Sequence, residues 1–384
     1  MPNTLTNLIP DFYAALDVVS REMVGAIPAV QRDPRADRCA LNATMRSTVV
    51  PVNSAAGDIT PAMSLPSAAY QTIGNKTFTI QKSRFAPFSW TGEEQGNVEG
   101  GPGYLTIQQD QIAQAIRALV NEIENDVCDY AALGASRAYG TAGTTPFGTA
   151  GDLSDAAQVR KILDDNGAPL SDRHIVLSTT AAATMRGKQT NLFKVNEAGD
   201  SNFLRQGVLG NIFGFDFRES AQVNNATKGA MTGALLNGAG AVGDTTITFD
   251  TGTVNTTGIV AGDIVTIGNF KYVVATGTTS TSGTFTIAAP GLQEVVADNT
   301  AISVNNTSVR NLAFTRNAIL LGTRLPALPR EGDLATDREL ITDPRSGLVF
   351  ELACYPGFRM VTYHVSIAWG VSVMKPEHLA ILMG

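Results

Sequence analysis

The clearest hydrophobic pattern in the chain is one apolar stripe between residues 107 and 135. Its members recur at spacings of three and four, which places them on one face of a helix: Ile112, Ile116, Leu119, Val120, Ile123, Val127 and Tyr130. The polar residues between them fall mostly on the other side: Gln108, Asp110, Arg117, Glu122, Glu124 and Asp129. Thr106 and Gln109 form a capping-box pattern at the start. A helix of this length would span about 40 Å, and its single apolar stripe needs a sheet to pack on.

The end of the chain alternates in the manner of a β-strand. Between residues 357 and 377, apolar side chains take every second position: Val361, Tyr363, Val365, Ile367, Trp369, Val371 and Val373. This predicts half-buried antiparallel strands, the natural partner of the long helix. Phe78 and Ile80 alternate with polar residues and predict a further strand near residues 76–85.

The N-terminal hundred residues contain less core material. Apolar spacing predicts a helix from about Pro10 to residues 25–28, followed by a polar stretch to residue 47 that we interpret as an extended arm. Residues 48–103 are rich in Pro, Gly, Ser and Thr and end in a turn-forming, acidic stretch. We expect them to project as a two-stranded flap that finds its hydrophobic partner on another molecule. Its charged residues are the candidates for inter-subunit ion pairs: Lys76, Lys82, Arg84, Glu93 and Glu94.

The pattern in the central part of the chain predicts alternating helices and strands that are interrupted by a β-rich insertion. Predicted elements are a helix capped by Ser154 and ended by Asn166–Gly167, a strand at 174–178, a helix at 178–186 stopped by Gly187, and a strand at 213–218. Residues 226–307 are dominated by Thr, Gly and Val, with turns every ten residues or so. They predict an inserted all-β domain whose ends lie close together, with its own small core around Ile247, Val265, Ile267, Val273 and Ile287. The fold class is therefore α+β.

Composition excludes several classes of protein. The 384 residues are 43% hydrophobic, so global disorder is excluded. A formal net charge of −7 disfavours a protein that grips nucleic acid over its whole surface. There is neither an apolar run long enough for a membrane span nor a signal-peptide pattern, so we expect no membrane partner and synthesis in the cytoplasm. Cys39, Cys128 and Cys354 lie far apart and are interpreted as reduced thiols.

No catalytic constellation emerges from the motifs. Gly238, Gly240 and Gly243 spell GxGxxG, but β-branched residues follow where a dinucleotide site needs a helix, so a Gly-rich linker is the better interpretation. His174, His364 and His378 share no ligand spacing; His174 is expected at a strand entry and His364 facing solvent. The adjacent acids Glu93–Glu94 and Asp164–Asp165 are interpreted as surface groups. We therefore expect no enzyme activity, no metal and no cofactor.

The order of arm, projecting flap, long helix on a sheet, and α/β domain with an insertion resembles the major capsid proteins of tailed double-stranded DNA bacteriophages, the Hong Kong-type shell fold. It is most similar to coat proteins of the short-tailed Salmonella phage kind, which also carry an inserted β domain. The phrases that carry the resemblance lie at residues 203–220 (FLRQGVLGNIFGFDFRES), 311–326 (NLAFTRNAILLGTRLP) and 369–382 (WGVSVMKPEHLAIL).

The resemblance implies a division of the chain into named parts. They are an N-terminal arm (1–47), an extended loop with peripheral-domain strands (48–105), the spine helix of the peripheral domain (106–150), axial-domain parts (151–225 and 308–335), the inserted all-β domain (226–307) and C-terminal strands of the axial and peripheral domains (336–384).

The resemblance also implies a function. The chain would self-assemble through pentamers and hexamers into an icosahedral virion shell around double-stranded DNA, made in the bacterial host cytoplasm with a scaffolding protein and a portal. An acidic chain suits a container, since packaged DNA must slide past the wall. Two alternatives are a nanocompartment shell, which shares the fold but encloses enzymes, and a β-rich surface adhesin, which the long helix does not fit.

Overall fold

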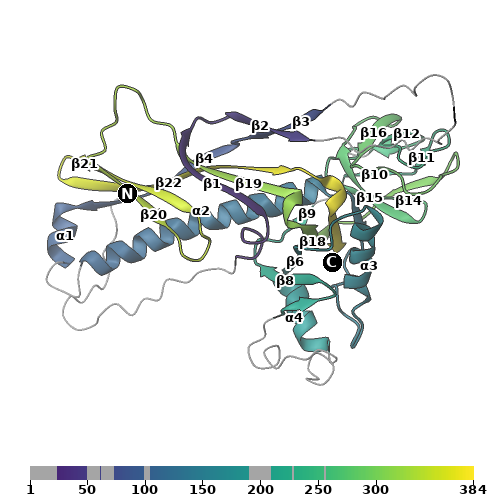
Figure 1. Ribbon diagram of the computed structural model, residues 1–384, viewed down its shortest axis with the longest axis horizontal. Coiled ribbons are helices and arrows are strands. Elements are labelled where there is room, and N and C mark those ends of the chain that lie inside the picture. Colours follow the sequence, from purple (N-terminus) through teal and green to yellow (C-terminus); the bar gives the residue numbers. More distant parts are fainter. Residues whose placement is uncertain are drawn as a thin grey trace.

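The computed structural model describes residues 24–49, 61, 73–98, 104–189, 209–226, 229–254 and 257–384. Within these residues the chain is mixed α and β, with far more strands than helices. Helix α2 (Tyr104–Gly134) runs along one side of a long sheet, and a second body of strands lies at its C-terminal end (Figure 1). The helix expected from Pro10 falls largely outside the described residues, and residues 24–30 form no helix.

Helix α2 confirms the stripe read from the sequence. It has 31 residues, and Ile116, Leu119, Val120, Ile123 and Val127 are all buried in the main core. It begins two residues before Thr106, so the capping box expected there is replaced by an earlier start. It ends at Gly134, where an added Cβ would lie 2.6 Å from a methyl carbon of Val373. Close contact with the sheet therefore requires a glycine at this end.

The sheet under α2 has six strands. They are β1 (Gln31–Cys39), β4 (Lys82–Thr91), β19 (Ile319–Pro326), β20 (Asp337–Thr342), β21 (Val349–Gly357) and β22 (Met360–Val373). Strand β22 is the long strand expected at the chain end, and it pairs with β4, β19 and β21. Val365, Ile367, Trp369 and Val371 pack in the core that includes α2. Ala368 points to the opposite face, where it meets Phe78 and Ile80.

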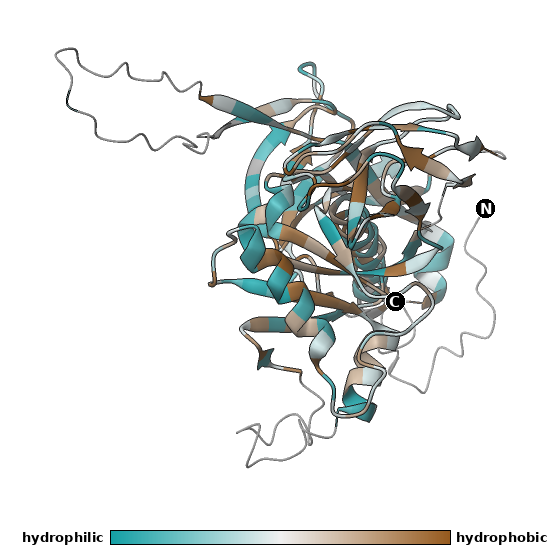
Figure 2. Ribbon diagram, turned by 90° about the vertical axis from the view of Figure 1, so that its right-hand side faces the viewer, coloured by the Kyte–Doolittle hydropathy of each residue, from teal (hydrophilic) through white to brown (hydrophobic). Residues whose placement is uncertain are grey.

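Strands β2 (Thr44–Val49) and β3 (Gly74–Thr79) form an antiparallel pair that projects from the body (Figure 2). This pair matches the expected flap, but the flap is shorter than the sequence suggested. Its apolar residues also do not wait for another molecule, because Phe78 and the following Ile80 are buried against Ala368 of the same chain. Residues 82–91 form β4 inside the six-stranded sheet, and the acidic stretch after it forms helix α1 (Gly92–Val98) instead of turns. Residues 31–39, expected as a free arm, form β1 and pair in parallel with β19. The one strand expected near residues 76–85 is therefore two strands, whereas β1 was hidden because a polar edge strand needs no apolar alternation.

The second body contains the α/β elements. Strands β5 (Arg137–Tyr139), β6 (Arg173–Ser178), β7 (Asn211–Ile212), β8 (Phe215–Ser220), β18 (Ser308–Thr315) and β23 (Leu379–Met383) are hydrogen-bonded in the order β5-β23-β18-β6-β8-β7. Helices α3 (Ser154–Asp165) and α4 (Thr179–Lys188) pack on them. These elements confirm the predicted pattern within a few residues. Leu153 is the N-cap residue of α3 where Ser154 was expected, and α4 continues one residue past Gly187.

The inserted segment forms a closed barrel. Its strands β11 (Ala234–Leu236), β12 (Thr246–Asp250), β14 (Ile264–Ile267), β15 (Phe270–Thr276), β16 (Gly283–Ile287) and β17 (Ala301–Val304) pair in the order β14-β17-β11-β12-β16-β15, and β15 returns to β14. A small pair, β10 (Met231–Thr232) and β13 (Thr253–Val254), lies beside them. Closure leaves the barrel without long open edges. Gly238, Gly240 and Gly243 lie between β11 and β12, consistent with a linker.

The two ends of the insertion meet as expected. Strand β9 (Asn225–Ala226) pairs with β18, with Ala226 opposite Ser308. The predicted barrel core holds for Ile247, Val265, Ile267 and Ile287. Val273 is the exception, because it lies in the main core together with Ile264. The cause is strand β15, which also pairs with β5 of the second body at Lys271 and Tyr272. The short 3-10 turns η2 (Arg316–Ala318) and η3 (Pro376–His378) complete the described elements.

Candidate inter-subunit surfaces

Two of the five charged residues expected at subunit contacts lie on β4 and bind acids of α2. The Lys82 ammonium lies 2.9 Å from Asp126 Oδ1 and 3.1 Å from Glu122 Oε1, and Arg84 Nε lies 3.2 Å from Glu122 Oε1. Burial lowers the pKa of Lys82, but hydrogen bonds to Asp126 and Glu122 outweigh it, so this pKa is raised. These pairs tie the spine helix to its own sheet.

The other three lie on β3 and α1. Lys76 donates to the carbonyl oxygen of Met374, and burial lowers the pKa of this lysine. Glu94 is not the surface acid expected, since it is 9% exposed and accepts the Thr91 N–H at 2.9 Å while the Thr91 hydroxyl accepts the Glu94 N–H at 3.2 Å. This reciprocal cap starts α1. Glu93 is exposed and forms no ion pair within the described part of the chain. The inter-subunit role of all five stays a prediction.

The end of the six-stranded sheet that lies farthest from the barrel exposes large apolar side chains. Phe358, in the turn between β21 and β22, is 91% exposed, and Met360 beside it is 39% exposed. Residues of β4, α1 and this turn line a groove of about 700 Å³. Leu334, before β20, is 87% exposed. Exposed apolar side chains of this kind are typical of contact surfaces, and periodicity did not reveal them because Phe358 and Leu334 lie outside the helices and strands.

The helical pattern placed Glu124 of α2 on the polar side, and it made no assignment for Asp126, yet both acids are buried. Glu124 is 1% exposed and accepts hydrogen bonds from the N–H groups of Gly25, Ala26 and Ile27. Asp126 is 7% exposed and accepts from the Trp369 indole N–H at 2.8 Å. The available signal was their position beside the apolar stripe, in the run ENDVCD. The turn of α2 from Glu122 to Asp126 therefore contacts β4, β22 and residues 25–27.

The remaining candidate chemistry is structural within the described residues. His174 is 3% exposed in β6, and burial lowers its pKa. His364, expected to face solvent, is half-buried and stacks on Phe85 at 4.8 Å. Cys39, Cys128 and Cys354 are free thiols, as expected. The described residues bring no three His, Cys, Asp or Glu side chains together as a metal site. No described helix is long and apolar enough to cross a membrane.

Solved structures with a similar fold come from bacteriophages. The chain is similar to a structure from the capsid of the cyanophage P-SCSP1u, with a TM-score of 0.54 and 11% identity over 100% of this chain and 95% of that one. It is similar to a structure from Mycobacterium phage Che8, with a TM-score of 0.50 and 13% identity over 99% and 98%. It is also similar to a structure from the mature capsid of bacteriophage PhiM1, with a TM-score of 0.50 and 13% identity over 96% of this chain and 89% of that one.

The chain has the fold of phage capsid subunits. No protein-family model and no curated protein matches its sequence. At these identities the likeness is one of fold, and it covers nearly the whole chain.

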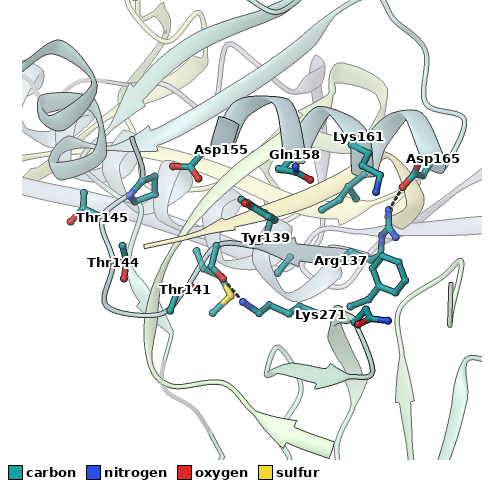
Figure 3. A pocket seen from close by; sticks show the side chains of 17 residues that line it. Arg137, Tyr139, Thr141, Thr144, Thr145, Asp155, Gln158, Lys161, Asp165 and Lys271 are labelled. Carbon is teal, nitrogen blue, oxygen red and sulfur yellow. Dashed lines mark hydrogen bonds and ion pairs between the residues drawn. The ribbon is translucent and has the colours of Figure 1, made fainter. Parts of the chain in front are cut away.

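In this capsid fold, the barrel joins the second body beside a polar cavity of about 450 Å³ (Figure 3). Arg137 of β5 binds Asp165 of α3 at 3.1 Å, and its guanidinium lies 5.4 Å from the ring centre of Phe270 in the barrel. Lys271 of the barrel donates to the Gly140 carbonyl, and Arg310 of β18 donates to that of Gly262. Cationic side chains of the barrel and of the second body thus each donate a hydrogen bond across the junction, and these bonds hold the barrel in place.

Proposed function

We propose that this protein is the major capsid protein of a tailed bacteriophage, and that it self-assembles into the icosahedral virion shell around the double-stranded DNA genome. The observation that carries the proposal is the likeness of fold over 95% or more of this chain to three phage structures, two of which are capsids by name. A partial likeness would fit a shared domain, whereas this one covers nearly the whole length of each chain.

The surface of the described residues supports self-association. The β2–β3 pair projects from the body, and strands β1 and β20 form edges of the six-stranded sheet. Phe358 and Leu334 place apolar side chains in water at its periphery. Exposed edges and apolar patches are liabilities in a monomer, and neighbouring copies in a shell would cover them. Pentamers and hexamers of one chain would use the same surfaces with small changes of angle.

The charge of the chain supports a container for DNA without sequence-specific binding. A net charge of −7 gives no broad basic lining, so packaged DNA would meet little electrostatic retention at the wall. We propose a scaffolding protein and a portal as further partners, and the bacterial host cytoplasm as the place of synthesis, because a closed shell of one subunit type needs a guide for curvature and an opening for DNA. The protein itself would act without catalysis.

Expression of the full chain in bacteria, followed by gradient sedimentation and negative-stain imaging, tests the proposal. We expect curved sheets or closed shells. A chain that stays monomeric at every protein concentration and salt tested would refute self-assembly. Nuclease-protected DNA in particles from the source organism supports the genome container, whereas particles filled with enzyme and free of DNA identify a nanocompartment.

A surface variant makes the same test sharper. Phe358→Asp should leave the monomer folded, because this side chain is 91% exposed, yet it should reduce shell yield by placing a charge in a contact. Ser280→Asp, in an exposed barrel loop, is the control for added charge alone. Equal shell yields from both variants would contradict a role for the apolar turn.

A further inference from the structure

The root of the N-terminal segment, which we define as residues 24–30, is held by one buried carboxylate. Glu124 Oε1 accepts the N–H groups of Gly25 at 2.7 Å and Ala26 at 2.6 Å, and Oε2 accepts that of Ile27 at 2.8 Å. Glu124 is 1% exposed, and Ala26 and Ile27 are fully buried. Three consecutive backbone donors on one carboxylate form an anion-binding concavity of the kind that usually holds a ligand.

No cation among the described residues forms an ion pair with Glu124. The charge is therefore compensated by the root segment itself. A buried carboxylate without such donors is costly, and buried backbone N–H groups without an acceptor are also costly. Each side depends on the other, so the contact behaves as a specific latch rather than as general packing.

The root segment is also enclosed from the opposite side. A Cβ at Gly25 would lie 2.4 Å from the carbonyl oxygen of Glu219, at the end of β8, so only glycine fits there. Glu219 is in turn held by Arg186 of α4 at 2.6 Å. The root segment thus lies between the spine helix α2 and the α/β body that contains β8 and α4.

The same turn of α2 contacts the peripheral sheet. Asp126, two residues after Glu124, binds the Trp369 indole of β22 and the Lys82 ammonium of β4. Asn125 accepts a hydrogen bond from Asn224, which follows β8. Glu124 is therefore placed where the six-stranded sheet, the α/β body and the N-terminal segment meet.

We propose that Glu124 is a positioning residue that latches the root segment, residues 24–30, to the junction of the two bodies. The consequence for assembly rests on the proposed shell function. With the latch open, the rest of the subunit stays folded, but the root segment is no longer held at the junction, and contacts between copies that depend on this junction lose their geometry.

Hydrogen exchange of the full-length chain, read by mass spectrometry with fragmentation to single residues, tests the latch directly. Glu124→Gln has nearly the same shape, but it removes the charge and turns an amide donor toward one of the three N–H groups. We expect the amides of residues 25–27 to exchange at least about tenfold faster than in the wild type, since a hydrogen bond to a charged group is lost. Exchange in β6 and β18 should stay unchanged.

Two further variants complete the design. Gly25→Ala pushes the root segment away from Glu219 and leaves Glu124 intact, so it should produce the same faster exchange, and it decides the question if Glu124→Gln does not fold. Asp126→Asn is the matched control on the same helix, since Asp126 has no contact with the root segment. It should leave the amides of 25–27 at the wild-type rate.

Shell yield by sedimentation and imaging then separates the latch from its consequence. Faster exchange in both root variants, together with malformed or missing shells, supports the proposal. Unchanged exchange in a folded Glu124→Gln or Gly25→Ala protein overturns the latch. Faster exchange with normal shells overturns the assembly role. If the wild type itself forms no shells, the proposed function fails, while the exchange measurement still decides the latch.

Discussion

The tertiary structure makes a specific prediction for the stability of a chain from which the barrel has been excised. We consider a chain that lacks residues 227–307 and joins Ala226 to Ser308 through a short Gly/Ser linker. The two flanking residues are already paired across β9 and β18, so the linker spans a short distance. Loop-closure entropy changes by only about 0.6 kcal/mol per doubling of loop length, so closure itself costs little.

The cost comes from shared core. Ile264 and Val273 belong to the barrel, yet both are buried in the main core, together with Ala138 of β5 and residues of α2. Removing two fully buried aliphatic side chains forfeits about 3–6 kcal/mol of apolar burial. Against a total stability of about 5–15 kcal/mol for a domain, this loss is large. We therefore expect an excised chain that folds but has clearly lower stability, rather than one unaffected by the excision.

Urea unfolding followed by circular dichroism and tryptophan fluorescence measures this effect. The excised chain should unfold at a lower urea midpoint than the full chain. Ile264→Ala in the full chain should lower the free energy of unfolding of the main body by about 2–5 kcal/mol. Ile247→Ala is the control, because Ile247 lies only in the barrel core, and it should destabilise the barrel more than the main body. An excised chain with an unchanged midpoint would show that the shared core contributes nothing and that the barrel is an independent unit.

Three further outcomes are expected. Leu119→Asp or Ile123→Asp should abolish soluble folding, because each places a charge in the main core at a cost of several kcal/mol; soluble variants with normal circular dichroism would show that the helix face is wrong. Burial raises the pKa of Asp33, but the hydrogen bond and charge of Arg324 outweigh it and lower this pKa, so the pair stabilises the fold at neutral pH and this stabilisation is lost as the pH falls through the acid range below 3.8. Between pH 7 and that range, the free energy of unfolding should therefore decrease less in Asp33→Asn than in the wild type. Equal decreases in both proteins, measured by urea unfolding, would contradict the contribution of the pair. Asp126→Asn should weaken the contact of α2 with Trp369, so the shift in tryptophan emission should occur at a lower urea concentration than in the wild type. The same emission profile in both proteins would count against this contact.

Much of the architecture follows from local pattern. The stripe from Ile116 to Val127, the alternation in β22 and the turn-punctuated runs of the barrel each repeat with the period of one type of element. Such patterns are strong because one face of each element is buried and the other is not. The order of these elements, together with the three phrases at residues 203–220, 311–326 and 369–382, was enough to suggest the capsid fold that the structural comparison then supports.

Edge strands and buried acids could not be predicted in this way. Residues 31–39 are a strand only because β19 offers them hydrogen bonds, and such an edge strand needs no apolar period. The strand expected near residues 76–85 is divided between β3 and β4, and the pairing of residues 82–91 with β22 defines the second of these. Glu124 occupies a polar helical position and is nevertheless buried, because the backbone of residues 25–27 supplies its donors from 97 to 99 positions away in sequence. Backbone N–H groups are present in every non-proline residue, so no composition or motif records which of them a carboxylate binds. By itself, the sequence determined the elements that bury one face and the order in which they follow one another. The tertiary structure alone decided that Lys82 and Arg84 bind α2, that Val273 belongs to the main core, and where residues 24–30 are held, since each depends on a contact between residues distant in the chain.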